Sequence, residues 1–126
     1  MIAAVDTSSL VAFLGGQSGS DVTLLDRLLD AGAVMLPPIT LVEILSDPKL
    51  PGVVLKHLEK IPLLATSNGY WKRAGLLRAR VISKSFKCRL GDSLIAQSCI
   101  DHGVPLITRD KDFRHFAKYA GLQLLS

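Results

Sequence analysis

The stretch Ile2-Ala-Ala-Val-Asp6 decides the predicted fold. Four successive apolar residues without alternation are typical of a strand buried on both faces, as in parallel sheets covered by helices. Similar short apolar runs recur at residues 33–36, 61–64, 104–108 and 122–125. Apolar spacing and helix-end signals predict the intervening helices at residues 8–14, 21–31, 40–45, 52–60, 69–84, 92–102 and 113–119. This alternation predicts the α/β class, with a parallel central sheet of about four to five short strands sandwiched by helices.

The length and composition predict one domain over residues 1–126. The chain is 48% hydrophobic, which excludes an intrinsically disordered protein. Its two cysteines, Cys88 and Cys99, are too few for a disulfide scaffold and too far apart for a zinc knuckle. The chain has no run of 18 apolar residues, and its start lacks the basic segment of a secretory signal. We therefore expect a cytoplasmic protein that makes no contact with membranes.

Basic residues are concentrated in the second half of the chain. Residues 1–71 hold four lysines and arginines against seven acids, and residues 72–126 hold eleven against four. The segment from Lys72 to Arg89 has seven bases and no acid. Two interpretations are open: a solvated helix face, or a surface that contacts the phosphates of a nucleic acid. Trp71, just before this segment, has the spacing of a core residue, although it could also stack on a base.

Four acids follow predicted strands or lie at helix starts beside them. Asp6 directly follows the first strand, and Asp110, with Asp112 close behind, follows the strand at 104–108. Glu43 is the only charge in an apolar helix, and Asp92 begins another helix. Ligands of α/β proteins bind beyond the carboxyl ends of the strands. Because converging carboxylates repel one another, a divalent cation with oxygen ligands, such as Mg²⁺, would explain the set.

Each acid also has a purely structural interpretation. Asp6 and Asp92 could stabilise helix N-termini. Thr40 and Glu43 have the spacing of a capping box, and the acids after residue 108 fit an exposed turn. The set carries the case for a cation site, because four unrelated helix caps near one sheet edge would be a coincidence.

Four segments of the chain resemble the sequence blocks of PIN domains, and they come in the same order. They are Ile2-Ala-Ala-Val-Asp6-Thr-Ser-Ser, Ile39-Thr-Leu-Val-Glu43-Ile-Leu, Arg89-Leu-Gly-Asp92-Ser-Leu-Ile-Ala96 and Pro105-Leu-Ile-Thr108-Arg-Asp110-Lys-Asp112-Phe113. The blocks span nearly the whole chain. A chain of this length most resembles the VapC-type toxins of prokaryotic toxin–antitoxin pairs.

This resemblance implies a metal-dependent ribonuclease. Catalysis and the binding of Mg²⁺, or alternatively Mn²⁺, would fall to Asp6, Glu43, Asp92 and Asp110. Asp112 could replace Asp110 or support it. Thr7 and Thr108 could orient a carboxylate or a metal-bound water through their hydroxyl groups.

The resemblance also implies partners. These would be an RNA substrate, a cognate antitoxin that blocks the acidic site, and a second copy of the chain in a homodimer. The apolar helices at 22–29 and 50–58 are candidate partner surfaces, although core packing explains them equally well. The bases expected to contact RNA are Lys84, Lys87, Arg89 and Arg109.

Two alternative folds lack a residue that they require, and one alternative function stays open. A receiver-like domain would need an aspartate after the middle strand, and Leu64 is followed by Ala65-Thr-Ser-Asn68. A haloacid-dehalogenase-type phosphatase would need Asp-x-Asp, where this chain has Asp6-Thr-Ser8. A catalytically idle PIN-like module that only binds RNA or a partner stays open as the alternative to a nuclease.

Overall fold

A small parallel sheet forms the centre of the protein. The computed structural model describes residues 1–125. Within them, β1 (Ala3–Val5) lies between β2 (Val34–Met35) and β3 (Leu106–Ile107), and both pairings are parallel. Ala4 is opposite Met35 on one side and Leu106 on the other. The predicted α/β class with a parallel sheet is therefore confirmed.

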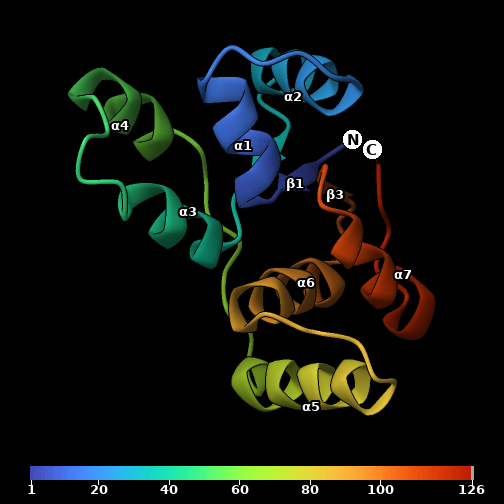
Figure 1. Ribbon diagram of the computed structural model, residues 1–126. Helices are drawn as coiled ribbons and strands as arrows, with labels where there is room; N and C mark the ends of the chain where they lie inside the picture. The colour runs from blue at the N-terminus through green and yellow to red at the C-terminus, as the bar shows by residue number, and fades with distance from the viewer. Residues whose placement is uncertain (126) are drawn as a thin grey trace.

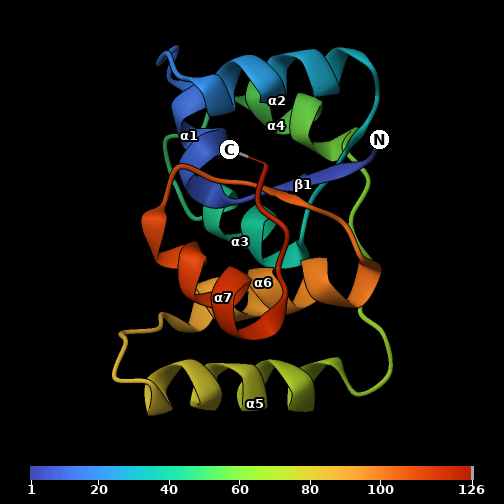
Figure 2. The same ribbon diagram turned by 90° about the vertical axis from the view of Figure 1, so that its right-hand side faces the viewer.

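Helices cover both faces of the sheet. Figures 1 and 2 show α1, α2 and α4 on one side of β1, and α5, α6 and α7 on the other. The helices are α1 (Thr7–Leu14), α2 (Ser20–Asp30), α3 (Pro38–Leu45), α4 (Gly52–Glu59), α5 (Tyr70–Ser83), α6 (Leu90–His102) and α7 (Arg114–Ala120), with a 3₁₀ turn, η1 (Lys111–Phe113), before α7.

The alternation of side chains along β1 divides the core into two clusters. Ala3 and Val5 pack with Leu10 of α1 and Leu25 of α2 in one cluster. Ala4 points to the opposite face and belongs to the second cluster, which α5, α6 and α7 complete. Successive residues of a strand point to opposite faces, so a strand this short serves both layers only if every position is apolar.

The sheet has fewer strands than predicted. The runs at 61–64 and 122–125 each form one isolated parallel bridge, Leu36 with Leu63 and Leu106 with Leu124. They therefore lie at the two edges of the sheet without becoming strands. At the edge beside β2, the carbonyl oxygen of Pro62 accepts a hydrogen bond from the Leu36 amide. Proline has no N–H to donate in return, which limits the hydrogen bonding between the two segments. The described residues thus form three strands rather than four or five.

Trp71 does not pack in the core, contrary to its predicted position. Its side chain is 65% exposed, and Tyr70 is buried in its place, with its hydroxyl donating to the carbonyl of Leu94 at 2.6 Å. The buried face of α5 consists of Tyr70, Ala74, Leu77 and Val81. One residue corresponds to about 100° around a helix, so the shift from 70 to 71 moves the indole to the solvent side.

None of the helices among residues 1–125 is long and apolar enough to cross a membrane.

Candidate active site

All four predicted acids line one cavity at the carboxyl end of β1. The cavity has a volume of about 210 Å³, and four chain segments supply its walls. The lining residues are Asp6, Thr7, Ser8, Glu43, Arg89, Asp92, Ile95 and Asp110. The position agrees with the general placement of ligand sites in open parallel sheets.

Asp6, directly after β1, is the most buried of the four acids that line this cavity. It is 3% exposed, and its carboxylate accepts hydrogen bonds from the Ser9 amide at 3.1 Å and the Thr108 hydroxyl at 2.6 Å. The Ser8 hydroxyl lies 2.9 and 2.8 Å from its two oxygens. Asp6 is therefore the N-cap of α1 as well as a wall of the cavity, so its structural and site interpretations hold together.

Glu43 reaches the cavity because the capping box suggested by its sequence does not form. Helix α3 begins at Pro38, so Thr40 lies inside its first turn. The Thr40 hydroxyl donates to the carbonyl of Val5 at 3.0 Å and fixes α3 against the end of β1. The Glu43 carboxylate instead accepts a hydrogen bond from the Thr7 hydroxyl. A Cβ atom at Gly91 would lie 3.1 Å from Glu43 Oε2, so glycine lets the start of α6 approach closely.

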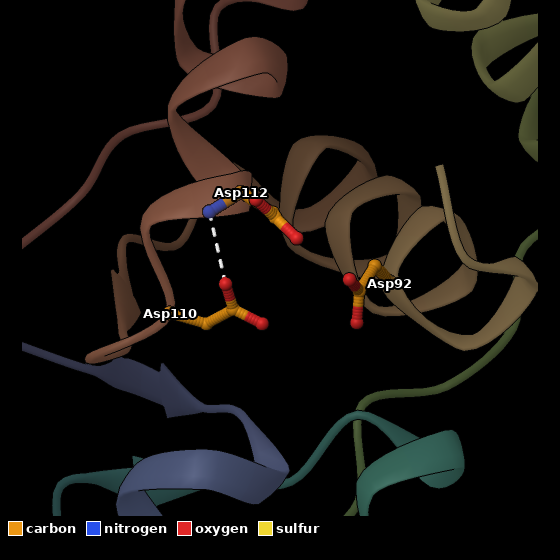
Figure 3. A group of neighbouring side chains, drawn as sticks. All are labelled: Asp92, Asp110 and Asp112. Atoms are coloured by element: carbon orange, nitrogen blue, oxygen red, sulfur yellow. Dashed lines mark hydrogen bonds between the residues drawn. The ribbon is translucent and has the colours of Figure 1, made fainter. Parts of the chain in front are cut away.

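Three aspartates face one another at the cavity (Figure 3), and two of them, Asp92 and Asp110, belong to its lining. Asp92 lies in the first turn of α6, Asp110 follows β3, and Asp112 lies in η1. One carboxylate oxygen of each lies within 4.8 Å of the other two. Asp110 also caps η1, since its Oδ1 accepts from the Asp112 amide at 2.9 Å. Asp110 lines the cavity, while Asp112 is exposed beside it.

The electrostatics of the site disfavour so many negative charges. Burial raises the pKa of Asp6, and the nearby Asp110 raises it further, against the hydrogen bonds from Thr108, Ser9 and Ser8. Burial likewise raises the pKa of Asp92 to about 6, with added repulsion from Asp110, Asp6 and Glu43. Carboxylates that are costly to ionise together become stable when a cation neutralises them.

The donor set matches a hard divalent cation. The acids that line the cavity, Asp6, Glu43, Asp92 and Asp110, bring four carboxylate groups to it. Mg²⁺ and Mn²⁺ prefer such ligands and keep several waters, for which a cavity of this size has space. The Thr7 and Thr108 hydroxyls donate to Glu43 and Asp6, so they orient two of the candidate ligands.

The predicted RNA-contacting bases divide into two groups. Arg89 lines the cavity, and Lys84 and Lys87 lie exposed in the segment between α5 and α6 that leads to it. Arg109 points elsewhere, because its guanidinium forms an ion pair with Asp21 of α2 at 2.7 Å. The placement of Arg109 therefore does not support a phosphate contact.

Sequence reasoning missed three polar residues around the site. Ser8 binds both oxygens of Asp6, and Ser9 donates through its amide to Asp6 and through its hydroxyl to Asp21. A run of hydroxyl residues directly after Asp6 was the available signal for both serines. Asp21 is 5% exposed, and nothing in its sequence context separates it from a surface acid.

A second, apolar cavity lies between α1, α2 and α4. Its volume is about 550 Å³, and Leu10, Phe13 and Leu14 of α1 form one wall. Leu29 of α2 and Val54 of α4 line it as well. Both helices that were named from sequence as candidate partner surfaces therefore contribute to this cavity.

The chain belongs to the PIN domain family, whose model matches residues 3–119. No curated protein matches the sequence significantly. Two solved structures share the fold over nearly the full length of both chains. A chain of VapBC2 from Rickettsia felis, solved bound to a DNA fragment from its promoter, superposes with a TM-score of 0.76 at 21% identity, covering 99% of this chain and 98% of that one. A chain of VapBC-5 from Mycobacterium tuberculosis, a member of a family of toxin–antitoxin systems, gives a TM-score of 0.67 at 20% identity, covering 98% and 97%.

Proposed function

We propose that this PIN domain is a Mg²⁺- or Mn²⁺-dependent ribonuclease, the cytoplasmic toxin of a VapBC-type pair. The convergence of Asp6, Glu43, Asp92 and Asp110 on one cavity carries the proposal. The family membership and the two toxin–antitoxin neighbours support the same assignment.

The chain's own residues divide the work of phosphodiester hydrolysis. The four carboxylates hold the cation, and Thr7, Ser8 and Thr108 keep two of them in fixed orientation. A bound Mg²⁺ would lower the pKa of a water molecule and stabilise charge on the leaving oxygen. Arg89 at the cavity attracts the phosphate, and Lys84 and Lys87 extend this positive surface along the RNA backbone.

The test is cleavage of single-stranded RNA by the purified chain with Mg²⁺ or Mn²⁺. We expect cleavage that EDTA abolishes, and that Asp6→Asn and Asp92→Asn each reduce by at least about a hundredfold, the scale of losing a catalytic charge. Cleavage that survives both substitutions and the chelator would overturn the proposal. RNA binding without cleavage would instead identify the idle module.

The apolar cavity between α1, α2 and α4 is the proposed contact for the antitoxin. Leu14 is 38% exposed beside it, and Val53 of α4 is 63% exposed nearby in the sequence. An amphipathic helix from a partner would cover such a cavity with its apolar face. The homodimer stays a prediction of the resemblance, and light scattering of the isolated chain tests it.

A further inference from the structure

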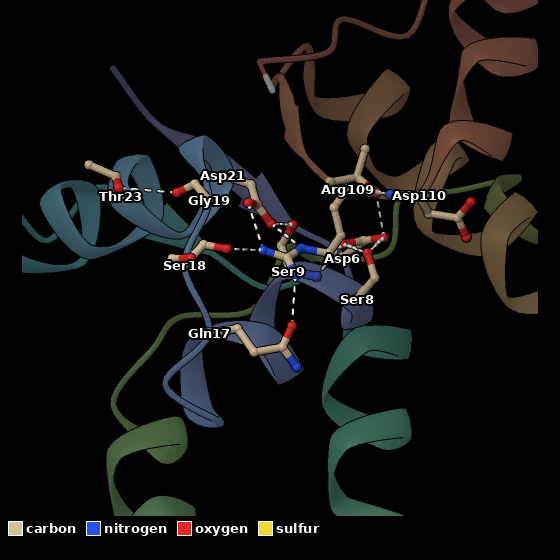
Figure 4. A network of polar contacts seen from close by, with 11 residues as sticks. Asp6, Ser8, Ser9, Gln17, Ser18, Gly19, Asp21, Thr23, Arg109 and Asp110 are labelled. Carbon is tan, nitrogen blue, oxygen red and sulfur yellow. Dashed lines mark hydrogen bonds and ion pairs between the residues drawn. The ribbon is translucent and has the colours of Figure 1, made fainter.

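The side chain of Arg109 is committed to the loop between α1 and α2 (Figure 4). Its Nε and Nη2 donate to the two oxygens of Asp21 at 2.7 and 2.9 Å. Its Nη1 donates to Gln17 Oε1 at 2.9 Å, and Nη2 also donates to the carbonyl of Ser18 at 3.1 Å. A guanidinium has five N–H donors, and this one makes four hydrogen bonds within the chain, so little donor capacity is left for a phosphate.

The loop is shaped around this ion pair. Gly19 has φ of +150°, a conformation that side-chain-bearing residues rarely adopt. A Cβ atom there would lie 2.5 Å from Asp21 Oδ1 and 2.8 Å from Arg109 Nη2. The backbone can therefore pass close to both charged groups only because residue 19 is glycine.

The ion pair is connected to Asp110 through the backbone of Arg109. Arg109 lies between Thr108 and Asp110 in the sequence. The Thr108 hydroxyl accepts from the Asp110 amide at 3.0 Å and donates to Asp6 at 2.6 Å. Fixing Arg109 therefore also fixes the short segment that presents Asp110 to the cavity.

A second connection runs from the ion pair to Asp6. Ser9 donates through its hydroxyl to Asp21 at 2.8 Å and through its amide to Asp6 at 3.1 Å. The interactions therefore form a closed ring, from Asp6 through Ser9, Asp21 and Arg109 to Thr108 and back to Asp6. Asp21 does not line the acidic cavity, so it belongs to the ring without being one of the candidate ligands.

Carboxylates that repel one another would move apart unless the segments carrying them are held together. The Asp21 side chain is 7% exposed, so loss of Arg109 would leave a nearly buried carboxylate without its charged partner. We propose that Asp21 and Arg109 are a positioning pair that holds residues 108–110 so that Asp110 and Asp6 face the same cation. This inference rests on the proposed metal-dependent function.

Calorimetric titration of the full-length chain with Mn²⁺ alone tests the pair. Arg109→Lys keeps the charge but cannot make the two-pronged contact, and Asp21→Asn keeps the shape without the charge. The matched control is Arg73→Lys, because Arg73 makes a similar two-pronged contact with Asp101, at 3.0 and 2.7 Å, at the far end of α6. Circular dichroism confirms that each variant is folded at the titration temperature.

We expect Arg109→Lys and Asp21→Asn to weaken Mn²⁺ binding about tenfold, the lower end of the effect of losing a group that orients metal ligands. Arg73→Lys should bind Mn²⁺ like the wild type. Raising the cation concentration should restore RNA cleavage by Arg109→Lys, because the substitution raises the cation concentration at which cleavage is half-maximal.

Unchanged Mn²⁺ affinity in a folded Arg109→Lys would overturn the inference. Weakened RNA binding at saturating metal would then return Arg109 to its predicted role as a phosphate contact. If the wild type itself binds no Mn²⁺, the proposed function fails first, and the two failures are distinguishable.

Discussion

Replacing Asp92 by asparagine should stabilise the metal-free protein at neutral pH. The folded-state pKa of Asp92 is raised from 3.8 to about 6, first by burial and then by Asp110. An acid whose pKa is raised by folding adds stability below pH 3.8, and that contribution is lost as the pH rises through 6. At pH 7 the ionised side chain therefore destabilises the fold, and asparagine removes the charge while keeping the shape.

The size of the effect follows from the shift. A shift of about two pH units corresponds to about 3 kcal/mol. Asp92 is only partly buried, so solvent screening reduces this figure to about 1.5 kcal/mol. For a domain of this size we expect the unfolding temperature to rise by about 5 °C. The difference between variant and wild type should shrink as the pH falls through 6 and disappear below about pH 3, where Asp92 is protonated in both the folded and the unfolded chain.

Thermal unfolding by circular dichroism in EDTA, at several pH values, measures this effect. Asp101→Asn is the control on the same helix, because the pKa of Asp101 is lowered by Arg73 and its loss should destabilise the protein at neutral pH. Mg²⁺ should then stabilise the wild type more than Asp92→Asn, since the variant lacks one ligand charge. A metal-free Asp92→Asn that unfolds at or below the wild-type temperature at pH 7 would refute the argument from charge repulsion.

Three further substitutions have defined expectations. Leu14→Glu should weaken binding of a co-expressed antitoxin at least tenfold in a pull-down titration but leave RNA cleavage unchanged. The control Leu76→Glu changes a leucine that is more exposed than Leu14 but lies on α5, and it should leave both unchanged. Arg89→Ala should weaken RNA binding and lower the slope of log K against log salt by about one, as fluorescence anisotropy would show, and an unchanged slope would argue against a phosphate contact. Gly19→Ala should lower the free energy of unfolding by about 1–3 kcal/mol in urea, from backbone strain and the close approach to Arg109, and a neutral effect would show that the loop can relax.

The helices and the acidic site could be predicted because their signals are local. Asp6 and Asp110 follow apolar runs, and parallel strands bring their carboxyl ends to one edge, so topology alone places these acids together. Glu43 shows where local reasoning is ambiguous. The capping-box spacing was present, but Pro38 starts the helix earlier, and Thr40 is used for a tertiary hydrogen bond.

The remaining differences depend on contacts between distant residues. Tyr70 rather than Trp71 is buried because its hydroxyl reaches a carbonyl on α6, which no spacing rule contains. Arg109 lies beside an acid of the site in sequence, but its partner Asp21 lies 88 residues away, on α2. The segments at 61–64 and 122–125 each form a single bridge to the sheet. How far such a segment pairs depends on the geometry of the strand beside it, which its own sequence does not contain.

The order of the strands has a consequence for synthesis of the protein. The central strand β1 is made first, and its partner β3 begins at Leu106. A ribosome that has translated three quarters of this chain has produced Asp6, Glu43 and Asp92, but neither Asp110 nor the strand that places it. Long-range pairing of this kind forms late, because the loop must close before the contacts can stabilise it. The nascent chain therefore lacks a complete acidic site until the segment from Leu106 to Asp110 has left the ribosome, so nuclease activity cannot begin before that segment emerges.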